Sequence, residues 1–208
     1  MKKIARISLI LFLMGVMLTP FAGGGASFAQ EQDDGSCFIS PDNPLVLTAE
    51  RGTVAIVECI DGAISTYTDA SGIQSVQDVE MGTQSAQVCG GRSTAYEQFG
   101  LTVTWYQASM QVWYDGRNVL GRAGPYQSYY YRSETGWSHE YHSAFLYRNT
   151  LPGPRQQAEG WGGFSHSTGW YDHEHHMIIT ATASGGCFAN DYFWGTLGNG
   201  WWHEVYAF

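Results

Sequence analysis

Residues 101–120, LTVTWYQASMQVWYDGRNVL, decide the fold class of this 208-residue chain. Apolar and hydroxyl side chains alternate over 101–105, and a second alternating run covers 109–114. A period of two is typical of a β-strand with one buried face. Asp115-Gly116 follows between β-forming residues, and this dipeptide is a strong hairpin signal. The segment therefore predicts two antiparallel strands joined by a turn at Asp115-Gly116.

Strand-like runs separated by turn residues continue to the end of the chain. We expect strands over 126–132, 139–147, 159–167, 174–184, 188–194 and 201–207. No segment carries a sustained helical pattern, and short strands at roughly ten-residue spacing are typical of β-sandwiches. The sequence therefore predicts a single all-β domain over 37–208, an antiparallel β-sandwich or jelly roll. Within it we expect 101–208 to form the regular strands and 37–100 to be irregular. Strands are expected over 45–48 and 53–59, whereas glycines interrupt 69–100, where we expect loops with one or two short strands.

The N-terminus has the three parts of a secretory signal peptide. Lys2, Lys3 and Arg6 precede an uncharged apolar run over 7–17, and Ser27-Phe28-Ala29 fits the small-x-small rule for cleavage. We expect a signal peptide over 1–29 and a flexible polar leader over 30–36. The apolar run is shorter than the roughly 20 residues that span a bilayer. The sequence therefore predicts export to the extracellular space or a periplasm, with no membrane span after cleavage.

Four cysteines, Cys37, Cys59, Cys89 and Cys187, form an even set in a chain expected to reach an oxidising compartment. Two disulfides are the natural interpretation, and the sequence does not choose among the three pairings. We favour Cys37 with Cys59 and Cys89 with Cys187. The fold is therefore expected to be disulfide-supported.

Charge limits the partners. Removal of residues 1–29 leaves seven arginines, no lysine and all 19 acidic residues, a net charge of −12. Such a field repels phosphate backbones and anionic membrane surfaces. We therefore expect no nucleic-acid partner, and a carbohydrate or an extracellular protein as the ligand.

Histidines suggest a metal site. His173 and His175 lie two apart in an expected strand and so share a face, while His139 and His142 lie in another strand. Imidazole ligands suit divalent transition metals. His173-Glu174-His175 is similar to the first part of the cupin motif, but residues 177–183 hold no glutamate. We expect no cofactor unless these four histidines converge on such a metal ion. The alternative is that they are solvated side chains on the edge of a strand.

Aromatic residues supply the leading functional hypothesis. The chain contains eight Trp and thirteen Tyr. Most should pack the core, but adjacent rings in a strand point to opposite faces, so some should be exposed. Exposed flat rings stack on the apolar faces of sugars and also mark protein interfaces. The candidate contact rings are Trp137, Trp161, Trp170, Tyr171 and Trp201. The leading hypothesis is a secreted binding or interaction module.

An enzyme is the alternative class, either a metal-dependent enzyme with the histidine-rich site or a glycoside hydrolase. The chain resembles small secreted β-jelly-roll glycosidases in size and aromatic content. Glycoside hydrolysis needs two carboxylates across a cleft. Glu140 and Glu174 are the candidates by position, although the local signatures of those families are missing and both acids fit solvated strand positions.

Overall fold

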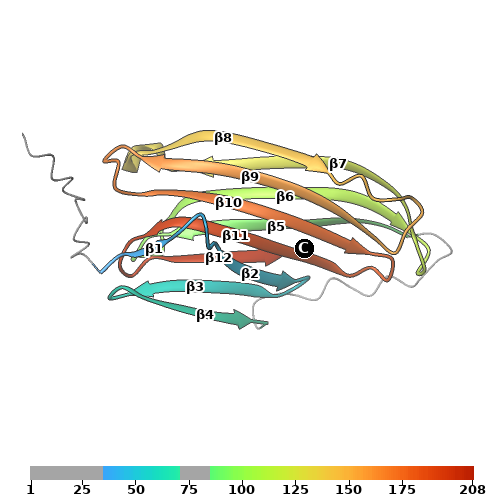
Figure 1. The fold of residues 1–208 in the computed structure, drawn as a ribbon, viewed down its shortest axis with the longest axis horizontal. Helices are drawn as coiled ribbons and strands as arrows, with labels where there is room; N and C mark the ends of the chain where they lie inside the picture. Colours follow the sequence, from blue (N-terminus) through green and yellow to red (C-terminus); the bar gives the residue numbers. More distant parts are fainter. Residues whose placement is uncertain (1–34, 71–84) are drawn as a thin grey trace, which may run out of the picture. The chain divides into compact units, whose positions relative to one another are not determined.

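The computed structural model describes residues 35–70 and 85–208. The expected signal peptide, and the leader up to residue 34, lie outside the described residues. Two six-stranded antiparallel sheets make up this part of the chain (Figure 1). The described residues contain no α-helix, and their one helical turn is the 3-10 segment η1 (Ser133–Thr135). The all-β antiparallel class expected from the alternation is confirmed.

Sheet A and sheet B are the names used here for the two sheets. Sheet A holds β1 (Cys37–Ile39), β2 (Leu45–Glu50), β8 (Trp137–Leu146), β9 (Arg155–His166), β10 (Asp172–Thr182) and β11 (Cys187–Leu197). Sheet B holds β3 (Val54–Ile60), β4 (Ala63–Asp69), β5 (Ser85–Tyr96), β6 (Thr102–Tyr114), β7 (Val119–Tyr131) and β12 (Trp202–Ala207). In sheet A the strand order is β1-β11-β10-β9-β8, with β2 also pairing β11, and in sheet B it is β4-β3-β12-β5-β6-β7.

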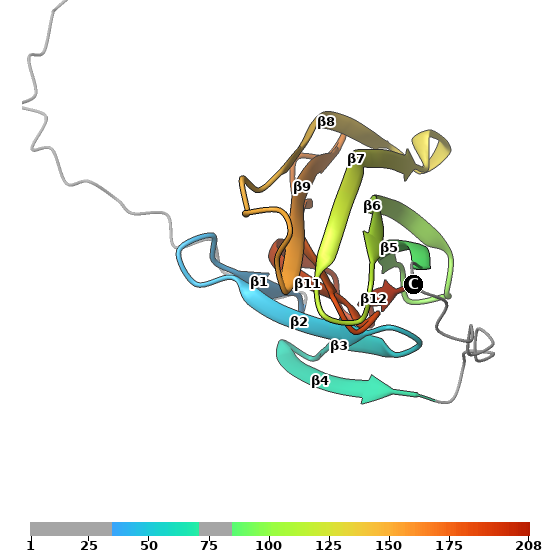
Figure 2. The ribbon, with the colours of Figure 1, turned by 90° about the vertical axis from the view of Figure 1, so that its right-hand side faces the viewer.

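The two sheets face each other and enclose the core between them (Figure 2). β10 and β11 lie over β5, and β9 lies over β6 and β7. Strand β10 shows why: His173, His175, Met177, Ile179 and Ala181 alternate with partly exposed residues and are all buried. Because alternate side chains of a strand point to one face, each strand contributes one row to this interior. The molecule is therefore an antiparallel β-sandwich.

Both disulfides join the two sheets. Cys37 on β1 bonds to Cys59 on β3, and Cys89 on β5 bonds to Cys187 on β11. The pairing favoured from the sequence is confirmed. The bridges close loops with sequence separations of 22 and 98 residues, so each restricts the unfolded chain as well as fastening sheet A to sheet B.

The described part of 37–100 is more regular than expected, and the strands expected over 45–48 and 53–59 correspond to β2 and β3. Five strands form there, and β5 runs for twelve residues through the middle of sheet B. Gly90 and Gly91 resemble strand breakers in the sequence, but both serve close packing. A Cβ on Gly91 would lie 2.5 Å from the Ala189 Cβ across the core, and one on Gly90 would lie 2.5 Å from the Phe208 ring. Glycine is there because neighbouring groups approach the backbone.

Candidate functional site: an outer groove and a buried polar cluster

A groove with a volume of about 1020 Å³ crosses the outer face of sheet B. The charged and aromatic residues that line it include Arg92, Tyr96, Trp105, Tyr130, Arg132 and Glu204. Five of them lie on β5, β6, β7 and β12, and Arg132 directly follows β7. These segments are far apart in the sequence. The strand order of sheet B brings them together, since β12, β5, β6 and β7 are consecutive neighbours.

Strand register sets the order of the side chains in the groove. Glu204 pairs with Thr94, Thr94 with Trp105, and Trp105 with Tyr130, so these four residues form one row across four strands. The next row carries Arg92 opposite Gln107. Directly opposed residues share a face of the sheet, and their side chains are within contact distance of one another.

Two ring pairs form the aromatic part of the groove. Trp105 and Tyr130 lie with centroids 6.3 Å apart and planes at 15°, and Tyr96 lies 5.1 Å from Trp202 with planes at 16°. Each ring is held by a neighbour on the adjacent strand. Trp105, Tyr130 and Tyr96 line the groove, and Trp202 packs against the Tyr96 ring.

Polar groups beside these rings are held in place. The Arg92 guanidinium lies 4.7 Å from the centroid of the Trp105 ring, and its Nε and Nη2 donate to Gln107 Oε1 at 3.0 and 2.7 Å. The Tyr96 hydroxyl donates to Glu204 Oε1 at 2.5 Å. Burial and the neighbouring Glu204 carboxylate raise the pKa of Tyr96. The groove thus offers a fixed cation and a phenol–carboxylate pair next to flat rings.

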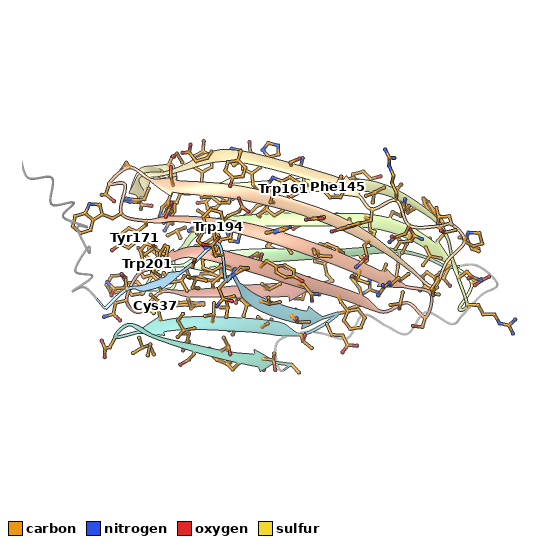
Figure 3. All side chains as sticks on the ribbon, viewed as in Figure 1. Cys37, Phe145, Trp161, Tyr171, Trp194 and Trp201 are labelled. Atoms are coloured by element: carbon orange, nitrogen blue, oxygen red, sulfur yellow. A yellow bond between two sulfur atoms is a disulfide. The ribbon has the colours of Figure 1, made fainter. Side chains whose placement is uncertain are left out.

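The five rings expected to bind ligand lie elsewhere. Trp137 is buried in the core, and Tyr171 stacks on Trp201 at 4.9 Å at one end of the strands (Figure 3). Trp161 contacts Phe145 on the outer face of sheet A, and Trp170 is 67% exposed on the turn before β10. None of the five lines the groove. The alternation over 101–105 marked Trp105 as a strand residue, but it did not show which face was outside.

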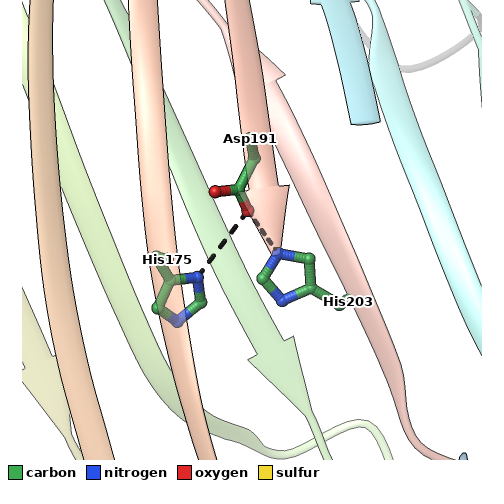
Figure 4. A group of neighbouring side chains, drawn as sticks. All are labelled: His175, Asp191 and His203. Carbon is green, nitrogen blue, oxygen red and sulfur yellow. Dashed lines mark hydrogen bonds and ion pairs between the residues drawn. The ribbon is translucent and has the colours of Figure 1, made fainter. Parts of the chain in front are cut away.

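A cluster of polar side chains lies inside the sandwich, between sheet A and the inner face of the sheet B strands that form the groove. His175 of β10, Asp191 of β11 and His203 of β12 are completely buried, and each offers a ligand atom within 4.8 Å of the others (Figure 4). His203 Nε2 lies 2.8 Å from Asp191 Oδ2, and His175 Nδ1 lies 3.9 Å from it. Buried ionisable groups are costly unless they pair, and these three pair with one another.

Ser93 of β5 stands at the centre of this cluster. Its Oγ lies 2.7 Å from His175 Nδ1, 2.5 Å from Asp191 Oδ2 and 2.5 Å from His203 Nε2. A hydroxyl donates one hydrogen bond and accepts two. All three contacts are satisfied when both imidazoles donate to Oγ and Oγ donates to the carboxylate. Asp191 Oδ1 and His203 Nδ1 remain buried without a hydrogen-bond partner.

Thr104 of β6 extends the network to His173. Its Oγ1 lies 2.6 Å from His173 Nε2 and 3.4 Å from His175 Nε2. Burial lowers the pKa of His175 to about 4 and that of His173 well below its ordinary value. Burial alone would raise the pKa of Asp191, but His175 and His203 outweigh it and hold that pKa below the usual range. The core therefore contains the Asp191 carboxylate together with the neutral imidazoles of His173 and His175.

The four histidines expected as metal ligands fall into two pairs. His173 and His175 belong to the buried network, whereas His139 and His142 lie on β8, 3.1 Å apart between His142 Nδ1 and His139 Nε2, with His139 stacked on Tyr129 at 3.9 Å. The Phe164 ring contacts His139 on one side and the buried pair on the other. Within the described residues, only His175 of the four belongs to a group with metal-ligand spacing. No local sequence motif around Asp191 or His203 indicates that they lie beside His175.

Glu140 and Glu174 lie on strands of sheet A, away from the groove. Glu140 accepts hydrogen bonds from Ser138, at 3.1 Å, and from Ser165. Glu174 accepts from the Tyr141 hydroxyl and from Trp194 Nε1 at 3.3 Å. Both carboxylates are thus engaged by neighbouring strands.

No protein-family model, curated protein or solved structure matches this chain. Within residues 35–70 and 85–208, no helix is long and apolar enough to cross a membrane.

Proposed function

We propose that this protein is an exported carbohydrate-binding module and that the groove on sheet B is its binding site. The observation that carries the proposal is the pairing of two flat ring surfaces, Trp105 with Tyr130 and Tyr96 with Trp202, beside fixed hydrogen-bonding groups. Sugars present apolar ring faces and a periphery of hydroxyls, so they fit this combination. Concave sites with rings and a few fixed polar groups are typical ligand sites. The two disulfides are compatible with export.

Binding, rather than hydrolysis, fits the groove. Glycoside hydrolysis needs two carboxylates that flank the scissile bond. Glu204 is the only acidic residue among the described residues that line the groove, and it is engaged by Tyr96. We therefore assign the groove no catalytic pair.

A glycan array probed with the purified protein tests this function. We expect binding to a restricted set of saccharides, and we expect Trp105→Ala to weaken binding at least tenfold, since loss of a stacked ring removes contact area. Trp170→Ala is the matched control, because Trp170 is exposed outside the groove. Retained binding in Trp105→Ala with loss in Trp170→Ala would move the site to the turn before β10. A protein that binds no saccharide would overturn the proposal in favour of a protein ligand.

Metal binding by the buried cluster is a second candidate function, and Asp191 favours it. This carboxylate is completely buried, and none of the ion pairs among the described residues joins it to an arginine. Imidazole and carboxylate ligands suit Zn²⁺ and other divalent transition metals. Ser93 Oγ would have to turn aside or become a ligand. Because all three ligand residues are closed to solvent, an ion there would be structural rather than catalytic.

Elemental analysis of the purified protein tests the metal site. We expect about one transition-metal ion per chain, lost in His203→Gln and retained in His142→Gln on the exposed face of β8. A protein free of metal after purification without chelator, and unchanged in melting temperature by added Zn²⁺, would leave the cluster as a hydrogen-bonded network alone.

A further inference from the structure

We propose that the groove selects an anionic saccharide, whose carboxylate or sulfate groups bind Arg92 and Arg132. The inference rests on the proposed glycan-binding function of the same groove and names its ligand class.

The side chains that line the groove are mainly basic, whereas the chain as a whole is acidic. The chain has 19 acidic and ten basic residues, yet the groove is lined by two arginines and one acid. Among the described residues, the three ion pairs within 4 Å all involve histidines, so neither Arg92 nor Arg132 has a carboxylate partner. In an acidic protein, two arginines without acids in one groove are a local attraction for anions.

Glu204, the single acid of the groove, is tied to another residue. Its carboxylate accepts a hydrogen bond from the Tyr96 hydroxyl at 2.5 Å, on the side of the groove formed by β12 and β5. It lies in the row of Thr94 and Trp105, whereas Arg92 lies in the neighbouring row, opposite Gln107. Among the described residues, no ion pair within 4 Å joins Glu204 to either arginine.

Arg92 is held ready for a ligand. The Trp105 ring lies beneath the guanidinium at 4.7 Å, and Gln107 Oε1 accepts hydrogen bonds from Nε and Nη2. These contacts leave Nη1 without a partner among the described residues. A planar guanidinium held in this way loses little freedom when it donates to a carboxylate or sulfate oxygen.

The two arginines flank the ring pair of Trp105 and Tyr130. Arg92 pairs with Gln107, two residues beyond Trp105 on β6, while the Arg132 N–H bonds to the Val103 carbonyl, two residues before it. Four residues of strand span roughly 13 Å. The Arg92 guanidinium lies over Trp105, and the Arg132 backbone lies toward the other end of this span, so an oligosaccharide along the groove can bring charged groups of different sugars to the two arginines.

Three sets of oligosaccharides of equal length test the inference: neutral, uronic-acid-containing and sulfated, each titrated into the purified protein. We expect the uronates or the sulfated sugars to bind at least tenfold more tightly than the neutral set, with affinity falling as salt rises. The better of the two charged sets identifies whether carboxylate or sulfate is the recognised group.

Arg92→Gln and Arg132→Gln should each lower the affinity for the charged ligand by about tenfold, and so narrow the difference in affinity between the charged and the neutral sets. Arg155→Gln, on an exposed arginine of β9, is the matched control and should bind as the parent does. Equal affinity for neutral and charged sugars would overturn the anionic selectivity and leave glycan binding standing. If no saccharide of any set binds, both the inference and the proposed function fail.

Discussion

The two faces of sheet B carry different sets of polar side chains, although both sets come from the same strands. Strands β5, β6 and β12 each place one residue in the buried cluster and the next residue in the groove: Ser93 and Thr94, Thr104 and Trp105, His203 and Glu204. The period of two makes this separation automatic. On the inner face polar groups bond mainly to one another, whereas on the outer face neither Arg92 nor Arg132 forms an ion pair with an acid in the part of the chain that the structure describes. The inner face therefore contributes to the fold, and the outer face is the one that we propose as the ligand site.

Loss of the Cys89–Cys187 disulfide should have the largest effect on the fold, since it fastens the centre of sheet B to β11. Replacement of both cysteines by alanine should lower the free energy of unfolding by about 4.7 kcal/mol, from the chain entropy of a 98-residue loop. The same change at Cys37 and Cys59 should cost about 3.4 kcal/mol, because the separation is 22. Urea unfolding measures both. Equal losses would contradict the loop-length argument.

The second largest effect is expected at acid pH, where protonation of the buried histidines should lower the stability of the fold. His175 has a pKa of about 4 and His173 has a pKa well below its ordinary value, so below pH 6.5 the unfolded chain binds more protons than the folded protein. Their contribution to stability is complete above pH 6.5 and is lost as the pH falls. Each histidine should lower the free energy of unfolding by up to about 1.4 kcal/mol for every pH unit that lies below 6.5 and above its pKa in the folded protein. Urea unfolding at pH 6 and pH 5, with chelator present, gives the slope, and a flat profile would contradict buried neutral imidazoles.

Ser93→Ala should have a smaller effect. It removes the hydroxyl that contacts His175, Asp191 and His203, and so leaves buried donors and an acceptor unsatisfied, at a cost of about 1–3 kcal/mol. Thermal unfolding measures the loss. Thr66→Ala on β4, where the side chain is exposed, is the control and should change stability by less than about 0.5 kcal/mol. If the two variants melt alike, the cluster does not contribute to the fold.

Local patterns predicted local structure and little else. Alternation gave the β class, and Asp115-Gly116 marks the β6–β7 hairpin, where Gly116 has a φ of 87°. The full length of strand β5 was not predicted, because Gly90 and Gly91 resemble strand-breaking residues in the sequence. Only the structure shows that Phe208 and Ala189 pack closely against them.

The sites depended on contacts that no spacing records. Ser93 meets Asp191 and His203 across 98 and 110 residues of sequence, through the order of strands in two sheets. The His173-x-His175 spacing indicated a shared face, but not which residues lie opposite it. In the same way, the number of aromatic residues predicted exposed rings, and only the topology shows that Trp105 and Tyr130 are among those at the groove.

Thr104 and Trp105, neighbours on β6 that point to opposite faces, give the most direct test of the division between fold and ligand site. The measurement is calorimetric titration of the best array ligand into Thr104→Val and Trp105→Ala, each first checked for its melting temperature. We predict that Thr104→Val melts lower, because His173 loses its hydrogen-bond partner, yet binds within about twofold of the parent, whereas Trp105→Ala loses at least about tenfold, or about 1.4 kcal/mol. Equal losses of affinity in the two variants, or full affinity in Trp105→Ala, would contradict the account.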